Sequence, residues 1–336
     1  MKNLKLAAVC LSCLTMTGCS ALNFSVEGLI NAPKLTSEQS EIHQALIESV
    51  GSNITLKYPK NGEYRSAYVI ANIDDEPTDE AMVFYEYTSN GSEEDGLRVN
   101  ILDKDEDGKW YSVKELAGAG TDIDQVIISP MGSNNQTDVF VGYQNLTNDE
   151  KTMEIYSYTD GDFKRVALDT YSVLEPLDIN NDGYIELITI QRSTNNDTGA
   201  VTAKASMLNM KNNEITRGEN VDMCDNVTSY VSSKTGMLDS GRRAIFIDGL
   251  TADGKLQTEI IYYRYSGLQN PMQLRSEKLL PLCTRPAGYY SEDMDGDGDV
   301  EIPSTSPMVG YENAVADEML YMTTCLLYTS DAADDK

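Results

Sequence analysis

The feature that most constrains the fold of this chain is a repeat of about fifty residues that begins near Asn53. A strand rich in tyrosine, valine or isoleucine, a polar turn and a second strand recur as ILDKDEDGKWYSV, IYSYTDGDFKRVAL, SMLNMKNNEITRG and IYYRYSGLQNPMQL. Their turn residues Gly108, Gly161, Asn213 and Gly267 are separated by 53, 52 and 54 residues. Such even spacing indicates a repeat architecture rather than one irregular domain.

A second series of segments precedes these hairpins: VIANIDDEPTDEAMVFY, VIISPMGSNNQTDVFVGY, PLDINNDGYIELITI, GMLDSGRRAIFIDG and EDMDGDGDVEIPS. Each has a short candidate strand, a polar or acidic turn and usually an apolar strand. Together the two series give four strands per period, which is typical of a β-propeller blade. We therefore expect an all-β, propeller-like array of four-stranded blades over residues 53–324, with four units and the start of a fifth. A pair of β-sandwiches is the alternative, but it does not explain the spacing.

One short helix is expected before the repeats, over residues 36–51. Thr36 and Gln39 fit a capping box, an apolar stripe follows, and Gly51 provides a C-terminal stop. The only histidine is His43, so sites built from several histidines, such as zinc centres, are almost excluded.

Two loops of the second series carry acidic residues at alternate positions. DINNDGYIE and DMDGDGDVE both place oxygen-bearing side chains at positions 1, 3, 5 and 9 and a glycine at position 6, while position 7 can offer a backbone carbonyl. Calcium takes about six to eight oxygen ligands, and glycine permits the sharp turn that such a loop needs. We therefore predict two calcium sites, made of Asp178, Asn180, Asp182, Tyr184 and Glu186, and of Asp293, Asp295, Asp297, Asp299 and Glu301.

A third loop, NIDDEPTDE, keeps only part of this pattern. It has Pro77 where the glycine belongs, so we predict at most a weak metal site there, made of Asn72, Asp74, Glu76 and Glu80. The loops SPMGSNNQT and GMLDSGRRA have lost the acids and are expected to close without metal.

Two look-alike patterns are set aside. An EF-hand needs glutamate at position 12, where Thr189 and Ser304 stand. The stretch DKDEDG also alternates acids and ends in a glycine, but Tyr111 occupies position 9, so we expect a solvated β-turn.

The two full loops resemble the calcium loop of FG-GAP or VCBS-type repeats, found in integrin-α-like β-propellers. The resemblance covers roughly residues 53–310 and implies structural Ca²⁺ in loops that join two strands of one blade. YPKNGEYRSAYV and AIFIDGLTADGKLQTEIIYYRY are similar to parts of uncharacterised lipoproteins of Gram-positive anaerobes, which carry a helix followed by a propeller-like array. That similarity implies an architecture but no activity.

The N-terminus, MKNLKLAAVCLSCLTMTGCS, combines two lysines with an apolar run too short to span a bilayer comfortably. It ends in Met16-Thr17-Gly18-Cys19, which resembles the bacterial lipobox. The resemblance implies a signal peptide over residues 1–18, lipidation of Cys19, for instance by palmitate, and a tether over residues 19–35. The folded part would then lie outside the cytoplasm, anchored to the cell membrane.

The last residues, CLLYTSDAADDK, resemble the translation of a sequencing-library transposon adapter. We therefore expect residues 325–336 to be an artefact and the natural protein to be truncated here. A genuine acidic tail is the alternative.

Two cysteines, Cys224 and Cys283, remain for the folded part. In an exported protein they could form a disulfide, or they could stay as buried thiols. The pattern leaves both possibilities open.

The chain has a formal net charge of −28, which argues against nucleic acid or an anionic bilayer as its main partner. We favour a non-enzymatic binding or scaffold protein, attached to the membrane through its lipid, with a protein or carbohydrate ligand. An accessory subunit of a cell-envelope complex is the first alternative. A glycosidase or lyase with paired carboxylates is the second, although most acids fall in turn or loop positions.

Overall fold

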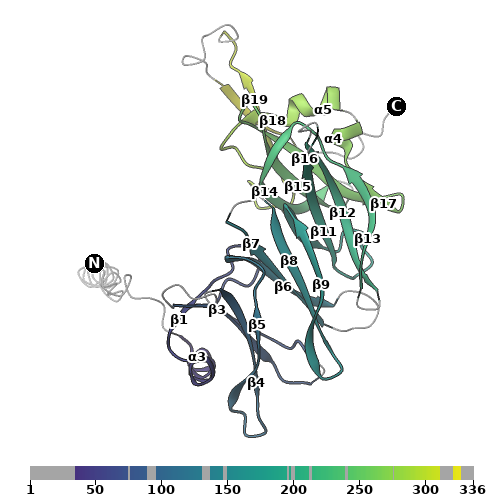
Figure 1. Cartoon of the computed structure of the whole chain (residues 1–336). Coiled ribbons are helices and arrows are strands. Elements are labelled where there is room, and N and C mark those ends of the chain that lie inside the picture. Colours follow the sequence, from purple (N-terminus) through teal and green to yellow (C-terminus); the bar gives the residue numbers. More distant parts are fainter. Residues whose placement is uncertain are drawn as a thin grey trace, which may run out of the picture. The chain divides into compact units, whose positions relative to one another are not determined.

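The computed structural model describes residues 35–74, 76–88, 96–130, 137–146, 150–194, 197, 201–211, 214–238, 241–274, 276–310 and 321–326. The chain divides into two compact units, Met1–Gln44 and Ala45–Lys336. The β-sheets belong to the second unit and form most of it (Figure 1).

The expected helix is present as α3, Ser37–Val50. Its capping box is reciprocal, because the Thr36 N–H donates to Gln39 Oε1 and the Gln39 N–H donates to Thr36 Oγ1, each over 3.1 Å. Gly51 ends the helix with φ of 86°, a conformation that favours glycine.

Four antiparallel sheets follow in chain order, and each is built from consecutive strands. We call them blades 1 to 4. Blade 1 holds β2 (Tyr68–Ala71), β3 (Glu80–Tyr87), β4 (Leu97–Lys104) and β5 (Trp110–Ala117); blade 2 holds β6 (Asp122–Pro130), β7 (Thr137–Gln144), β8 (Lys151–Thr159) and β9 (Asp162–Tyr171). Blade 3 holds β10 (Val173–Leu177), β11 (Glu186–Thr194), β12 (Val201–Lys211) and β13 (Glu214–Asp222); blade 4 holds β14 (Val227–Leu238), β15 (Arg242–Thr251), β16 (Lys255–Arg264) and β17 (Gly267–Gln269). The all-β, propeller-like array of four-stranded units is thereby confirmed.

Blade 1 departs from the others at its first strand. Besides β2, the short strand β1 (Ile54–Leu56) pairs with β3: Leu56 lies opposite Tyr85, while β2 pairs with the other end of β3. Two short strands therefore share the place that β6 fills alone in blade 2.

Beyond blade 4 the chain adds elements that the sequence pattern did not predict. The segment after β17 was expected to continue as a strand, but it forms helices α4 (Pro271–Leu274) and α5 (Ser276–Cys283). Asn270 Oδ1 accepts the Met272 N–H over 3.1 Å, and Pro271 takes the first helical position, so the helix begins here. β18 (Thr284–Pro286) then returns to pair with β16.

A fifth unit begins with β19 (Ile302–Pro307), which pairs with β20 (Tyr321–Leu326). Strand β20 extends two residues past the boundary expected at 324. The origin of residues 325–336 stays a prediction.

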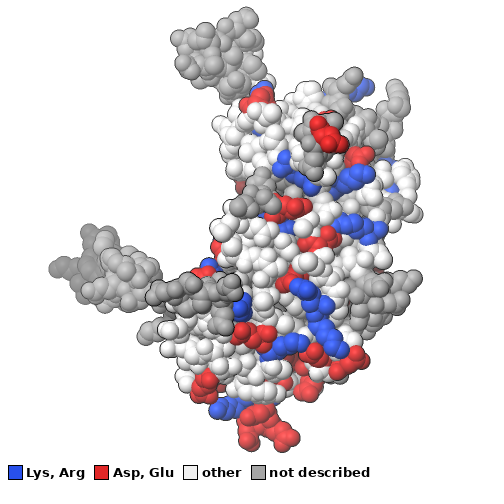
Figure 2. All heavy atoms as spheres, in the orientation of Figure 1, with Lys and Arg blue, Asp and Glu red and all other residues white. Residues whose placement is uncertain are grey.

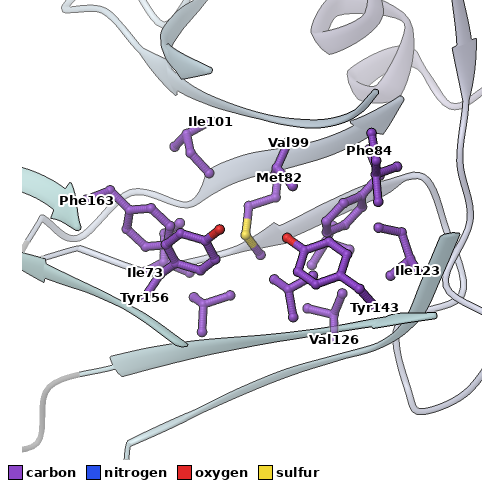
Figure 3. Packing of buried hydrophobic residues seen from close by; sticks show 14 residues of the cluster. Ile73, Met82, Phe84, Val99, Ile101, Ile123, Val126, Tyr143, Tyr156 and Phe163 are labelled. Atoms are coloured by element: carbon purple, nitrogen blue, oxygen red, sulfur yellow. The ribbon is translucent and has the colours of Figure 1, made fainter. Parts of the chain in front are cut away.

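Each middle strand sends its side chains alternately to the two faces of its blade. Val141 of β7 belongs to the apolar cluster shared with blade 1. The residue before it, Phe140, belongs to the cluster shared with blade 3. Figure 3 shows the first of these clusters, with Met82 and Phe84 of blade 1 lying opposite Tyr143 and Tyr156 of blade 2. The two-residue period of a strand thus places blades 2, 3 and 4 each between two apolar clusters.

Cys224 and Cys283 lie in the apolar cluster on the other side of blade 4, only 5% and 4% exposed. Both are free thiols, so the disulfide left open by the sequence is not formed. Burial raises the pKa of both thiols, which makes them poor nucleophiles.

Glu259 of β16 connects the two ends of blade 4. Its carboxylate is fully buried, and Oε2 accepts the Cys224 N–H over 2.8 Å and the Asn270 amide over 2.7 Å. Oε1 has no hydrogen-bond partner among the described residues. Burial is the main cause that raises the pKa of Glu259.

Replacing this carboxyl group should change how stability depends on pH. A folded-state pKa above the ordinary value of 4.5 means that the folded protein keeps a proton that the unfolded chain loses. Stability therefore falls as pH rises from 4.5 to the folded pKa, and remains lower above it. We expect Glu259→Gln, which stays neutral, to lose this part of the pH dependence when Tm is followed from pH 4 to pH 9. Glu106→Gln, in the exposed β4–β5 turn, is the control; identical Tm profiles of E259Q and wild type would contradict the account.

Candidate functional site

The three acidic loops occupy equivalent places in the fold and have equal lengths. Each is bounded by a pair of residues that lie opposite each other, with eight residues between them: Ala71 and Glu80, Leu177 and Glu186, and Glu292 and Glu301. The glutamate at position 9 therefore begins β3 and β11, and in the last loop it directly precedes β19. Two loops join the first and second strands of blades 1 and 3, and the last one leads into β19.

That glutamate makes the same hydrogen bond in all three loops: its Oε2 accepts the backbone N–H of position 2. All three carboxylates are buried, with exposures of 3%, 7% and 5%. The bonds are Ile73 N to Glu80 at 2.8 Å, Ile179 N to Glu186 at 3.1 Å and Met294 N to Glu301 at 2.7 Å. The sequence suggested these glutamates only as metal ligands; the structure shows that they also fix the loop backbone.

In the blade 3 loop, the other predicted ligands organise the backbone as well. Asp178 accepts the N–H groups of Asp182 and Gly183 over 3.0 and 3.2 Å, and Asp182 accepts that of Tyr184 over 2.9 Å. Gly183 has φ of 93°, which explains why glycine is needed at position 6.

The last loop repeats this arrangement. Asp293 accepts the N–H of Gly298 over 3.0 Å, and Asp297 accepts that of Asp299 over 2.9 Å. Gly298 has φ of 96°. Position 7 thus contributes its N–H in both loops, while coordination by its carbonyl oxygen stays a prediction.

The donor set of the last loop fits calcium. Asp293, Asp295 and Asp297 are exposed, and each offers a carboxylate oxygen within 4.8 Å of the others. Glu301 directly precedes β19. Several carboxylate oxygens gathered on one tight loop are the hard ligands that calcium prefers. Among the described residues, these three aspartates form the only such group of acids, histidines or cysteines.

The blade 3 loop differs in having a cation beside it. Arg243 of β15 places Nη1 at 3.1 Å from Asp178 Oδ2. Asn180 Nδ2 donates to Asp182 Oδ2 over 3.0 Å and to Glu186 Oε1 over 2.8 Å. Burial raises the pKa of Glu186 to about 7. A calcium ion would compete with the guanidinium and with a proton, so this loop should bind it more weakly.

The blade 1 loop is the least suited to a metal. Asn72 Nδ2 donates to the Glu76 carbonyl over 2.6 Å, and Asp74 Oδ1 accepts the Glu76 N–H over 2.7 Å. Pro77 cannot adopt the positive φ of the glycine at position 6. Burial raises the pKa of Glu80 to about 7. The weak site stays a prediction.

The look-alike stretch DKDEDG forms an exposed turn between β4 and β5, as expected. Asp105 Oδ1 accepts the N–H groups of Asp107 and Lys109 over 3.0 and 2.9 Å. Figure 2 shows acidic side chains at this hairpin tip, the lowest point of Figure 1, and elsewhere on this face it shows acids and bases interspersed. Cys19 and the predicted signal peptide lie outside the described residues.

No family model matches the chain, and no curated protein matches it. Similar solved structures include two putative 6-phosphogluconolactonases. The one from Bacteroides uniformis ATCC 8492 has a TM-score of 0.35 and 14% identity over 82% of each chain. The one from Bacteroides fragilis NCTC 9343 has a TM-score of 0.34 and 10% identity, over 82% of this chain and 81% of the other. Likeness at this level says nothing about activity, and the fold assignment rests on the strand pairing.

Calcium should stabilise the protein through the last loop. A ligand that binds only the folded state adds about 2.7 kcal/mol at about 100 times its Kd. We expect calorimetry to show a higher Tm in CaCl₂ than in EDTA, and Asp297→Asn to lose much of that rise. Asp107→Asn, in the look-alike turn, should keep the full rise. An unchanged Tm in calcium would show that the loops are not calcium sites.

Removing the guanidinium should strengthen the blade 3 site. In the Asp297→Asn background, we expect Arg243→Gln to raise the residual calcium affinity several-fold, measured by calorimetric titration, because Asp178 is freed from its ion pair. Arg217→Gln is the control, since Arg217 pairs with Asp169, away from the loop. Equal affinities with and without Arg243 would mean that it does not compete with calcium.

Proposed function

We propose that this chain is a lipid-anchored, extracytoplasmic binding or scaffold protein whose propeller-like blades are stabilised by structural Ca²⁺. The observation that carries the proposal is the recurrence of one loop of fixed length, with one buried glutamate contact, at equivalent places in three units. In two of these loops the oxygen donors suit calcium.

Burial around the loops supports a structural role for the ion. Position 2 of the first two loops is Ile73 and Ile179, each only 2% exposed. Ile73 lies in the apolar cluster between blades 1 and 2, and Ile179 in that between blades 3 and 4. An ion that stiffens these loops would also stabilise the packing between blades.

The anchor rests on the lipobox-like Met16-Thr17-Gly18-Cys19. In the described part of the chain, no helix has the length and apolar character needed to cross a membrane. The ligand we propose is a protein or a carbohydrate, because the net charge of −28 disfavours nucleic acid.

The anchor is tested by Cys19→Ser in the full chain, expressed in a bacterium that lipidates its exported proteins. We expect the wild-type protein in the membrane fraction and the variant in the soluble exported fraction, because the thiol is the acylation site. Cys13→Ser, within the predicted signal peptide, should leave the protein in the membrane fraction. Equal membrane association of C19S and wild type would contradict lipidation at Cys19.

A further inference from the structure

The segment that precedes the last acidic loop is attached to blade 4 by a buried ion pair. Arg285 of β18 and Asp248 of β15 are each 1% exposed, and Arg285 Nη2 lies 2.9 Å from Asp248 Oδ1. Ser291 is also 1% exposed; it donates its N–H to Asp248 Oδ2 over 2.7 Å and its hydroxyl to Oδ1 over 2.9 Å. The aspartate therefore holds the chain just before Asp293, which is position 1 of the loop.

The Arg285 guanidinium uses all five of its N–H donors in this place. Besides the bond to the aspartate, Nη1 donates to Thr258 Oγ1 over 2.6 Å and to the Cys283 carbonyl over 3.1 Å. Nε donates to the Tyr289 carbonyl, and Nη2 donates to Ser291 Oγ over 3.0 Å. Because the donors of a guanidinium form a rigid fork, the arginine fixes the segment that leads into the loop against β15 and β16.

The other end of the loop is held by the first strand of blade 4. Val300, at position 8, is 4% exposed and belongs to the apolar cluster on this side of the blade. It lies so close to Gly236 of β14 that a Cβ added to the glycine would come within 2.6 Å of Val300 Cγ2. The adjoining residues Met237 and Asp299 form a parallel β-bridge. The backbone between the predicted ligands at positions 7 and 9 therefore rests on β14.

This attachment distinguishes the last loop from the other two. Position 8 of the blade 1 and blade 3 loops is Asp79 and Ile185, and both are exposed. Those loops join two strands of one sheet, whereas the last loop leads into β19, which pairs with β20 in the fifth unit. The contacts of the last loop with blade 4 therefore connect two successive units.

We infer that blade 4 holds the last acidic loop in the conformation that its calcium site needs, through Ser291 at one end and Val300 at the other. Both are positioning residues, since neither is a predicted ligand. Calcium bound in this loop fastens the fifth unit to blade 4, in addition to stiffening the loop itself. The inference rests on the proposed calcium sites and gives one of them a specific task.

Calcium titration calorimetry of the full chain tests the inference with two mild variants, because removing either ion of the buried pair would leave the other uncompensated. Ser291→Ala removes the hydroxyl bonds, and Gly236→Ala places a methyl group against Val300. We expect each to weaken calcium binding about tenfold, because the neighbouring ligands are displaced. Asp182→Asn is present in every sample and removes a predicted ligand of the blade 3 loop, so the last loop dominates the titration.

Each test variant has a matched control in another part of the fold. Ser157→Ala removes a different buried hydroxyl that donates to a buried aspartate, Asp138 of blade 2. Gly118→Ala brings a methyl group within 3.0 Å of Leu97 and Tyr143, in the cluster between blades 1 and 2. Both controls should lower Tm and keep the calcium affinity of the parent.

Amide hydrogen exchange in EDTA measures the order of the loop without calcium. We expect peptides that cover residues 293–301 to exchange faster in S291A and G236A than in the two controls. Unchanged calcium affinity in either test variant, or exchange no faster than in the controls, would overturn the inference and leave the calcium sites standing. A parent that binds no calcium would refute the calcium sites, and exchange alone would then decide whether blade 4 orders the loop.

Discussion

The structure depends on sheets that are apolar on both faces. In β7, Phe140 and Val141 are adjacent residues, yet they serve different interfaces because side chains alternate along a strand. The same holds in β15, where Ile245 packs toward blade 3 and Phe246 toward the opposite side. A sheet of this kind is unstable in water alone, because one of its faces would remain exposed. The blades must therefore pack against their neighbours in chain order, and the loops are built on that packing.

The acidic loops bring carboxylates into the buried part of the blades. Each places a glutamate where the returning strand is already buried, and a buried carboxylate is unfavourable unless its charge is compensated. The N–H of position 2 compensates part of it, and the pKa values of Glu80 and Glu186, raised to about 7, show that burial still dominates. A divalent cation would supply the missing positive charge. In the blade 3 loop Arg243 supplies some of it from the next blade, which accounts for the different character of the two full loops.

Signals from residues close together in the sequence predicted the elements that such residues form, namely the hairpins and the first helix. The spacing of Gly108, Gly161 and Gly267 located the hairpins, and Thr36 with Gln39 located the start of the helix. Contacts between blades could not be predicted from these local signals, because nothing near Asp178 in the sequence indicates its ion pair with Arg243. The helix α4 was missed although Asn270 and Pro271 form a recognisable helix start, because the hairpin repeat favoured a strand there. The second role of the loop glutamates, holding the backbone, became visible only in the hydrogen bonds of the folded chain.

The central claim is that these loops hold calcium as part of the fold. Diffraction from crystals grown in CaCl₂, recorded at a wavelength where calcium scatters anomalously, tests it most directly. The account predicts an anomalous peak enclosed by Asp293, Asp295, Asp297 and Glu301, with about six to eight oxygen atoms at about 2.3–2.6 Å. A weaker peak is expected at the Asp178 loop. Ordered loops that contain only water at saturating calcium would contradict the account.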